Sequence, residues 1–159
     1  MSGTCCATAE AVRSTTRAAT PGEQPYAWPM NAVDDLSPLA EQLGQFGAVA
    51  YLVTVGPEGT PHVVSVRPKL EGRHLVAGGG QRTVANVAER PSVTLLWPAP
   101  PGTGYSLVLD AEAQAHPSNG GTVLEIRPTA AVLHRTPEGD PAMPSCVTIL
   151  PRARATGGR

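Results

Sequence analysis

The sequence predicts a mainly β protein whose strands form a barrel. Apolar and polar residues alternate with a period of two in six segments, and one short helical pattern is inserted among them. The chain has 17 glycines and 17 prolines among its 159 residues, enough for many turns between strands. The six predicted strands are 48–55, 62–70, 74–77, 92–97, 105–115 and 122–135.

Two short helices are expected beside the strands. The first begins at Ser37, a good N-cap, with Pro38 in the first helical position, and Gly47 ends it. The second covers 82–89, where apolar residues gather on one side, and Pro91 closes it. The apolar residues of the first helix recur at steps of three and four: Leu36, Leu39, Ala40, Leu43 and Phe46.

Length and charge limit the kind of partner. A chain of 159 residues corresponds to one compact domain. Its 12 basic and 13 acidic residues give a net charge of −1, so no overall field attracts nucleic acid or an anionic membrane. With only two Trp, three Tyr and one Phe, the core must be built from Val, Leu and Ala. We therefore expect a small-molecule partner, with no nucleic acid and no membrane.

The cysteines and the absence of long apolar runs indicate in which cellular compartment the protein is expected. Cys5, Cys6 and Cys146 form neither a disulfide framework nor a zinc-ligand spacing, which favours a reducing environment. The N-terminus lacks the pattern of a signal peptide, and no apolar stretch approaches about 18 residues. A cytoplasmic protein is expected.

Composition divides the chain into three parts. Residues 1–30 are expected to be an extension, either a mobile tail or an arm that lies on a partner subunit through Tyr26 and Trp28. The barrel domain covers 31–137, and 138–159 form a C-terminal tail. The end of the tail is expected to be loose and solvated, because its basic residues have no interleaved aromatic residues for nucleic-acid binding. These basic residues are Arg152, Arg154 and Arg159.

The glycine run 78–80 marks a candidate anion site. It stands between a predicted strand and a predicted helix, where unpaired backbone N–H groups converge. Arg82 adds a guanidinium suited to phosphate, and Thr83 adds a hydroxyl in the first turn, where the helix dipole favours negative charge. The alternative is that the glycines serve only to turn the chain.

A second group of candidates lies on the strand 62–70. Ser65, Arg67 and Lys69 alternate there, so their side chains project to one face. Either this face is simply exposed to solvent, or Arg67 or Lys69 borders the same anionic ligand. Pro68 cannot donate to a strand ladder, which indicates an edge, a bulge or an interruption.

No catalytic residue is assigned. Ser65, Ser92 and Ser106 lack the context of a nucleophile elbow, and no His or Asn partner can be identified for Cys146. A metal site is not expected either, because the histidines show no ligand spacing. A phosphate cradle without an acid–base pair indicates that a bound cofactor carries the chemistry. The four histidines are His62, His74, His116 and His134.

Four segments of the chain share an order and spacing with a known family: 59–66, 80–97, 105–110 and 127–135. Together they resemble the pyridoxamine 5′-phosphate oxidase-like split-barrel flavoproteins. The run 80–97, GQRTVANVAERPSVTLLW, resembles the family's Gly-Ser-Arg-Lys, helix, Asn-Pro-x-Val-Ser-Leu-Leu-Phe stretch. The run 59–66, GTPHVVSV, resembles its Gly-x-Pro-His-x-x-Pro-Val strand, and 105–110 and 127–135 resemble later strands. The resemblance spans about residues 34–135, and the order and spacing of the motifs make it moderately specific.

This resemblance implies a six-stranded Greek-key split barrel with short helices that forms a homodimer and binds FMN in the grooves between its subunits. Arg82 takes the position of the family's phosphate-binding Arg, Thr83 stands where that motif has Lys, and Gln81 occupies its Ser position. The strand 62–67 would pass along the isoalloxazine ring. Together with the basic face, the candidate cofactor-binding residues are Ser65, Val66, Arg67, Lys69, Gly79, Gly80, Gln81, Arg82 and Thr83.

The sequence also departs from the family pattern. Gly78 and Gly79 stand where the oxidases carry a Tyr-Thr type pair, which removes one hydroxyl on the phosphate side. The chain end does not resemble the substrate-holding C-terminal segment of true pyridoxamine phosphate oxidases, so vitamin B6 oxidation is not expected. Members of the wider superfamily bind the deazaflavin F420 or haem, or have lost the flavin, and the Arg-Thr motif leaves these cofactors open.

The leading hypothesis is an FMN-dependent, or F420-dependent, oxidoreductase that transfers hydride between reduced flavin and a small organic acceptor. The alternative is a carrier that holds a flavin, F420 or haem without turnover. A third hypothesis is an empty barrel that serves as a dimeric structural domain. The sequence identifies neither the substrate nor the electron donor.

Overall fold

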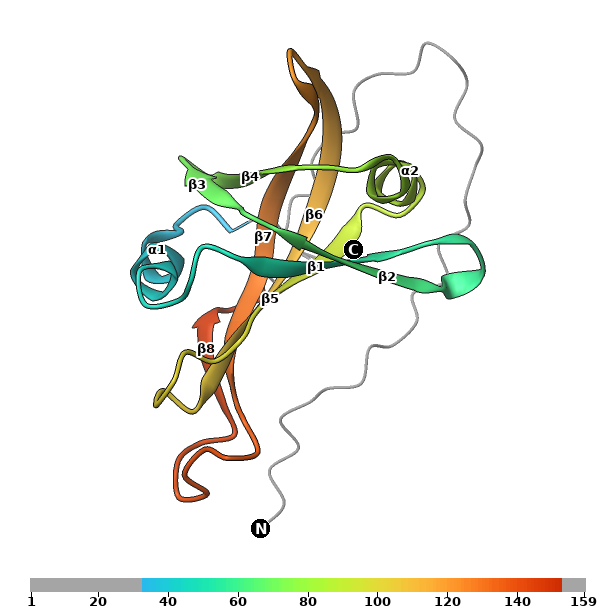
Figure 1. Ribbon diagram of the computed structural model, residues 1–159. Coiled ribbons are helices and arrows are strands. Elements are labelled where there is room, and N and C mark those ends of the chain that lie inside the picture. The colour runs from blue at the N-terminus through green and yellow to red at the C-terminus, as the bar shows by residue number, and fades with distance from the viewer. Residues whose placement is uncertain (1–32, 153–159) are drawn as a thin grey trace, which may run out of the picture.

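The computed structural model describes residues 33–152 and contains two α-helices and eight strands within them (Figure 1). The expected extension 1–30, with Tyr26 and Trp28, lies outside the described residues, as do the last seven residues. The elements are α1 Ser37–Leu43, β1 Ala50–Val55, a 3₁₀ turn Pro57–Gly59, β2 Pro61–Val66, β3 Lys69–Glu71, β4 His74–Gly78, α2 Gln81–Glu89, β5 Ser92–Trp97, β6 Tyr105–Ser118, β7 Gly121–Arg135 and β8 Cys146–Leu150.

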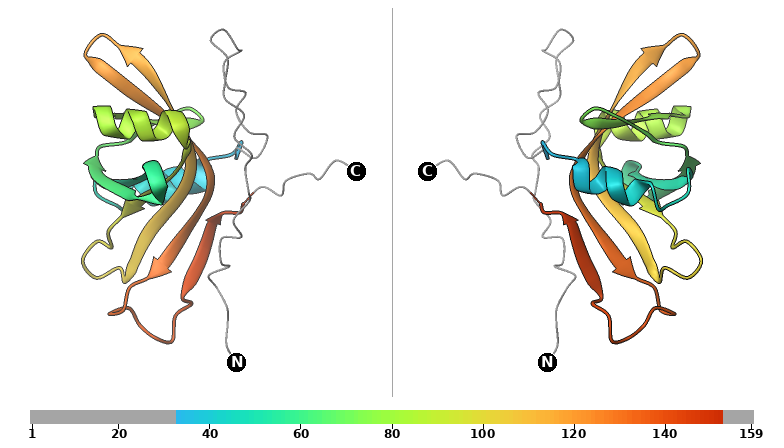
Figure 2. Two further views of the ribbon diagram at one scale, coloured as in Figure 1. Left: turned by 90° about the vertical axis from the view of Figure 1, so that its right-hand side faces the viewer. Right: turned by 90° about the vertical axis from the view of Figure 1, so that its left-hand side faces the viewer.

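All strands pair antiparallel in one sheet. Its order is β2-β1-β5-β6-β7-β4-β3, and β8 pairs with β7 beside this path. The two end strands of this order, β2 and β3, follow each other in the chain with only residues 67 and 68 between them. The sheet must therefore curve until its edges meet, which produces a barrel with a seam between β2 and the β3–β4 hairpin. The predicted split-barrel fold is confirmed. The two helices α1 and α2 lie on opposite sides of the barrel (Figures 1 and 2).

The strand prediction was wrong in two places. The predicted strand 62–70 is broken at Arg67 and Pro68, because proline has no N–H to give to a ladder. A strand that was not predicted, β8, lies in the expected tail and pairs with β7 from Ala131 to His134. The β6–β7 hairpin is also longer than expected and continues to Ser118 and Gly121, so it projects beyond the barrel (Figure 2).

The core consists of the inward-facing residues of the strands. Leucines dominate it, with alanines filling the narrow places and Trp97 almost fully buried. This agrees with the expectation of a core poor in aromatic residues. α1 contributes Leu36 and Leu39 at one end. The leucine and isoleucine residues that are fully buried are Leu39, Leu52, Leu75, Leu95, Leu107, Leu109, Leu124, Ile126 and Leu150.

The start of α1 differs from the prediction. Leu36, not Ser37, is the N-cap residue; its side chain is buried and makes no capping hydrogen bond. Asp35 Oδ1 accepts a hydrogen bond from the Ser37 amide at 2.9 Å. This backbone bond, followed by one to the Ser37 side chain, lowers the pKa of the Asp35 carboxyl. The helix ends at Leu43, one turn before the predicted stop at Gly47.

Among the described residues, no helix is both long enough and apolar enough to span a bilayer.

Candidate functional site

A groove opens at the seam of the barrel, where the sequence had placed part of its candidate site. It has a volume of ≈ 410 Å³ and is lined by Val49, Ser65, Val66, Arg67 and Gly78. Gly78 is the last residue of β4, shortly before α2. Ser65 and Val66 end β2, Arg67 follows it, and Val49 precedes β1. The fold therefore brings residues 65–67 and the first glycine of the run to one place. The remaining candidates of that region do not line this groove: Gly79, Gly80, Gln81, Arg82 and Thr83.

The predicted alternation along this strand is confirmed. Ser65 and Arg67 are exposed, while Val64 and Val66 are half-buried and pack on the core. Lys69 is exposed as well, but it lies on β3 opposite Val76 and is not part of the groove lining. The basic face thus continues across the break between β2 and β3.

The N-terminal end of α2 supplies unpaired backbone donors. Gly80 is the N-cap with extended backbone, and the first intrahelical bond runs from the Val84 amide to the Gly80 carbonyl at 2.9 Å. The amides of Gln81, Arg82 and Thr83 precede this bond and have no partner within the helix. Gln81 and Arg82 are exposed, so a guanidinium and three N–H groups occupy one helix end. Such an arrangement binds anions.

The position of the Thr83 side chain differs from the expectation that its hydroxyl faces a phosphate. Its side chain is only 2% exposed, because it lies on the face of α2 that packs against the barrel together with Val87. The hydroxyl that was expected to face a phosphate is therefore inside the fold. At the anion site, Thr83 can offer only its backbone amide.

The surroundings of the three glycines in the run 78–80 differ, so each is a glycine for a different reason. A Cβ on Gly79 would lie 3.0 Å from the Leu124 side chain and 3.2 Å from Val84, so this glycine allows α2 to approach β7. Its amide also donates to the Thr122 carbonyl at 3.1 Å. A Cβ on Gly78 or Gly80 would meet nothing within 4 Å. Close packing thus explains Gly79, and the backbone at the other two positions is open to a ligand.

Two buried polar residues that the sequence analysis missed fix α2 to the sheet. Asn86 Nδ2 donates to Thr54 Oγ1 at 3.0 Å, and Thr54 Oγ1 donates to the His62 carbonyl at 3.5 Å. Asn86 is 4% exposed and Thr54 is fully buried. A sequence signal did exist, since Asn86 shares the buried face of the helical pattern with Val87, where a polar residue needs a partner.

Three arginines of the described chain have a carboxylate partner, whereas the three candidate cations, like Arg90 and Arg135, have none recorded among the described residues. Arg73 pairs with Asp34, Arg127 with Glu125 and Arg152 with Asp110. For Arg67, Lys69 and Arg82 the structure records no ion pair within residues 33–152. Among the five described residues that line the groove, Arg67 is the one charged side chain, so the charge at the groove is positive although the whole chain is nearly neutral.

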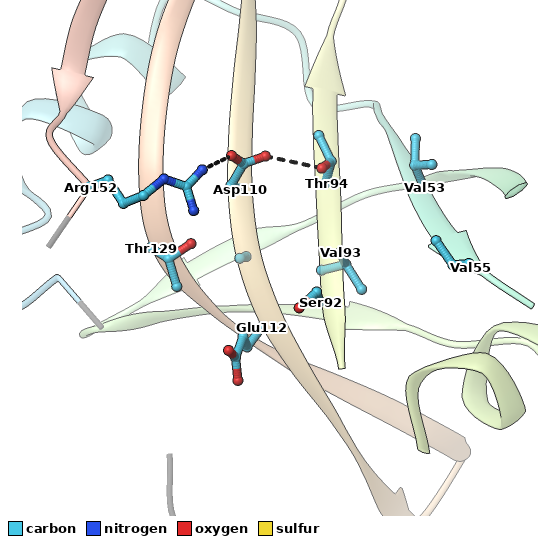
Figure 3. A pocket seen from close by; sticks show the side chains of 10 residues that line it. Val53, Val55, Ser92, Val93, Thr94, Asp110, Glu112, Thr129 and Arg152 are labelled. Carbon is cyan, nitrogen blue, oxygen red and sulfur yellow. Dashed lines mark hydrogen bonds and ion pairs between the residues drawn. The ribbon is translucent and has the colours of Figure 1, made fainter. Parts of the chain in front are cut away.

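A second hollow, of ≈ 420 Å³, lies on the outer face of the sheet (Figure 3). Asp110 is at its centre and accepts hydrogen bonds from Thr94 Oγ1 at 3.1 Å and Arg152 Nη2 at 2.6 Å. Both carboxylate oxygens are therefore engaged within the chain. Val53 and Val55 form its apolar side. None of the predicted site residues lies here.

The outer face also carries a polar cluster around Glu125. His116 Nε2 and His74 Nδ1 lie 3.5 and 3.9 Å from its two oxygens, and Arg127 Nη2 lies 2.9 Å from one of them. The guanidinium already neutralises this carboxylate, which disfavours a metal ion there. Within the described part of the chain, no three His, Cys, Asp or Glu residues are arranged to hold a metal.

The fold and sequence define a class of protein. No family model matches the chain. Its structure is similar to that of a protein from Clostridium acetobutylicum related to general stress protein 26, of the pyridoxinephosphate oxidase family, with a TM-score of 0.53 and 12% identity over 69% of this chain and 90% of that one. A candidate pyridoxamine 5′-phosphate oxidase from Listeria innocua gives a TM-score of 0.50 and 17% identity, covering 60% and 94% of the two chains. The fold is that of the pyridoxamine 5′-phosphate oxidase-like proteins.

Sequence relatives then place the chain more narrowly. Uncharacterized proteins of Mycobacterium bovis and Mycobacterium tuberculosis are each 37% identical to it over 128 residues, covering 71% of this chain and 89% of the relative. The protein belongs to the family of these two mycobacterial proteins, within the pyridoxamine 5′-phosphate oxidase-like fold.

Because Gly79 is closely packed and Gly80 is not, substitution by alanine should destabilise the protein more at Gly79 than at Gly80. Gly79→Ala should destabilise the protein by about 1–3 kcal/mol, because the new methyl group overlaps Leu124 in a packed core. Gly80→Ala should cost less, about 0.5–1 kcal/mol, because its Cβ enters open space and only the preference of the N-cap for glycine over alanine is lost. Urea unfolding followed by circular dichroism measures both. Equal losses at the two positions would contradict this assignment.

Proposed function

We propose that this protein is a flavin-binding split-barrel oxidoreductase that holds FMN at the seam and transfers hydride between the reduced flavin and a small organic acceptor. The observation that carries the proposal is that Gly78, three residues before the first residue of α2, lines one groove together with residues 65–67. A ligand with a flat ring and a phosphate at the end of a short chain matches this groove and the helix start that follows Gly78.

The residues fit such a cofactor chemically. The Arg82 guanidinium and the amides of Gln81, Arg82 and Thr83 would hold the phosphate, because no carboxylate within residues 33–152 pairs with this guanidinium and the three amides have no partner within the helix. The open side of Gly80 lets the phosphate reach the backbone. Ser65, Val66 and Arg67 would orient the ring through the exposed edge of β2. Bound FMN itself supplies the hydride chemistry.

The alternative function is a carrier that binds a flavin, F420 or haem without turnover. One observation favours it: the five residues that line the groove include no His, Cys, Asp or Glu. A proton needed by an acceptor would then have to come from solvent or from the acceptor itself. Oxidoreductase and carrier share the binding site and differ in whether a reductant can reduce the bound cofactor.

A second copy of the chain is the proposed partner. Tyr51 is 43% exposed and Val63 is 54% exposed, and both project from the outer face of β1 and β2, where Val53 directly opposes Val63. Exposed apolar groups that adjoin each other are typical of a surface that is covered by another protein. This surface borders Ser65, which pairs with Tyr51, so a homodimer would cover one side of the groove.

Titration with FMN tests the proposed site. Arg82→Ala should weaken FMN binding by about 1.5–3 kcal/mol, roughly ten- to a hundredfold in Kd, because a charge-assisted phosphate contact is lost. Arg90→Ala removes the same charge from the opposite end of α2 and should leave Kd within about twofold. Quenching of flavin fluorescence gives both constants. The proposal would be contradicted if titration with FMN, F420 and haem changed neither flavin fluorescence nor visible absorption, because the protein would then bind none of them.

Anaerobic mixing of the FMN-loaded protein with NADH or NADPH separates the two functions. The oxidoreductase proposal expects bleaching of the flavin absorption band, because hydride from the nicotinamide reduces the ring. Absence of bleaching with either donor would favour the carrier or the deazaflavin.

The oligomeric state tests the apolar surface. Val63→Lys should shift a dimer towards monomer in sedimentation velocity, because the substitution buries a charge without a partner. Met143→Lys is the matched control, since Met143 is 51% exposed but lies in the loop before β8. A wild-type monomer, or a dimer unaffected by Val63→Lys, would contradict this surface.

A further inference from the structure

Asn86 is a polar side chain buried on the inner face of α2, one helical turn after Arg82. Its amide would lose free energy on burial without a hydrogen bond, and the Nδ2 group finds that bond at Thr54 Oγ1, 3.0 Å away on β1. We propose that Asn86 is a positioning residue: together with Thr54 it holds the anion-binding end of α2 in register with the groove on β2. This inference rests on the proposed function, because it concerns how the phosphate and ring contacts of one flavin are matched.

The Thr54 hydroxyl connects all three elements. It accepts the bond from Asn86 and donates to the His62 carbonyl on β2 at 3.5 Å, and Thr54 and His62 are direct partners in the β1–β2 ladder. Because the Asn86 Nδ2 group can only donate, the hydroxyl accepts from it, and the hydroxyl proton is left for the longer and weaker contact with the His62 carbonyl. A polar connection therefore runs from α2 through β1 to the strand that continues into Ser65–Arg67.

The contacts around Asn86 leave its side chain little freedom. A Cβ on Gly56 would lie 3.3 Å from Asn86 Oδ1 and 3.4 Å from the Thr60 carbonyl, so the turn after β1 closes on the amide group. The Gly56 amide donates to that same Thr60 carbonyl at 2.8 Å. The glycine thus permits a close approach between this turn and α2.

The backbone bond from Gly79 to the Thr122 carbonyl holds the chain just before α2, but the apolar contacts of the helix itself do not fix its register in the way that a hydrogen bond does. Val87 is buried beside Asn86, but apolar packing is not directional and tolerates small rotations of a helix. A hydrogen bond weakens steeply when its angle or length departs from the optimum. Arg82 stands four residues before Asn86, about 6 Å along the helix axis, so a shift at Asn86 moves the guanidinium with it.

A comparison of FMN with riboflavin isolates the effect of helix position on the phosphate contacts, because riboflavin lacks the phosphate. The ratio of the riboflavin Kd to the FMN Kd measures the contribution of the phosphate contacts alone. Thr54→Val keeps the shape of the side chain but removes the hydroxyl, and this ratio should fall by about tenfold as Arg82 moves out of register. Asn86→Ala should give the same fall and is the milder change, since Thr54 keeps its bond to His62.

Two controls separate positioning from loss of stability. Thr54→Ser retains the hydroxyl and should preserve the ratio within about twofold. Val87→Ala destabilises the same helix through lost burial and should lower the unfolding midpoint in urea without changing the ratio. If α2 only needed to be folded, Val87→Ala and Thr54→Val would affect FMN and riboflavin alike.

The outcomes distinguish this inference from the proposed function. A wild-type protein that prefers FMN, with an unchanged preference in Thr54→Val and Asn86→Ala, overturns the positioning role and leaves the flavin site standing. A wild-type protein that binds FMN and riboflavin equally contradicts the phosphate site, and the positioning role with it. A fall in the ratio confined to Thr54→Val and Asn86→Ala supports both.

Discussion

The structure depends on the closure of one antiparallel sheet on itself. The strands at its two edges, β2 and β3, are separated by residues 67 and 68 alone, so the sheet has to curve through a full turn for the chain to continue. Proline at position 68 interrupts the ladder at that point, and the edges meet without pairing. The resulting seam leaves one stretch of β2 open to a ligand, while leucine-rich inner faces stabilise the barrel around it.

Helix α2 completes the seam because it begins where β4 ends. Gly79 brings the chain against Leu124, and the Asn86–Thr54 bond fixes the helix on β1. Gly78 lines the groove two residues before the N-cap of the helix, and the five described residues along that groove include no acidic side chain. A nearly neutral protein can thereby attract an anion at one place, because short-range fields depend on local partners rather than on net charge.

Much of this could be predicted from the sequence. Period-two alternation identified the strand regions, and the glycine run before an amphipathic helix identified the candidate anion site. What could not be predicted depends on contacts between distant residues. Strand β8 is short and half-exposed, so only its pairing with β7 defines it. Burial of the Thr83 hydroxyl follows from the rotation of α2 on the barrel, and the Asn86 partner lies 32 residues away in the chain.

Hydrogen exchange with and without FMN tests the central claim that the helix start and the groove form one site. The account predicts slower exchange in two separate segments, 61–67 and 78–84, because one ligand would cover the open edge of β2 and the free amides of α2 together. The loop 136–145, which is held by Arg135 through the carbonyls of Asp140 and Met143, should exchange at the same rate in both states. Protection in only one of the two segments, or protection confined to the 136–145 loop, would contradict the account.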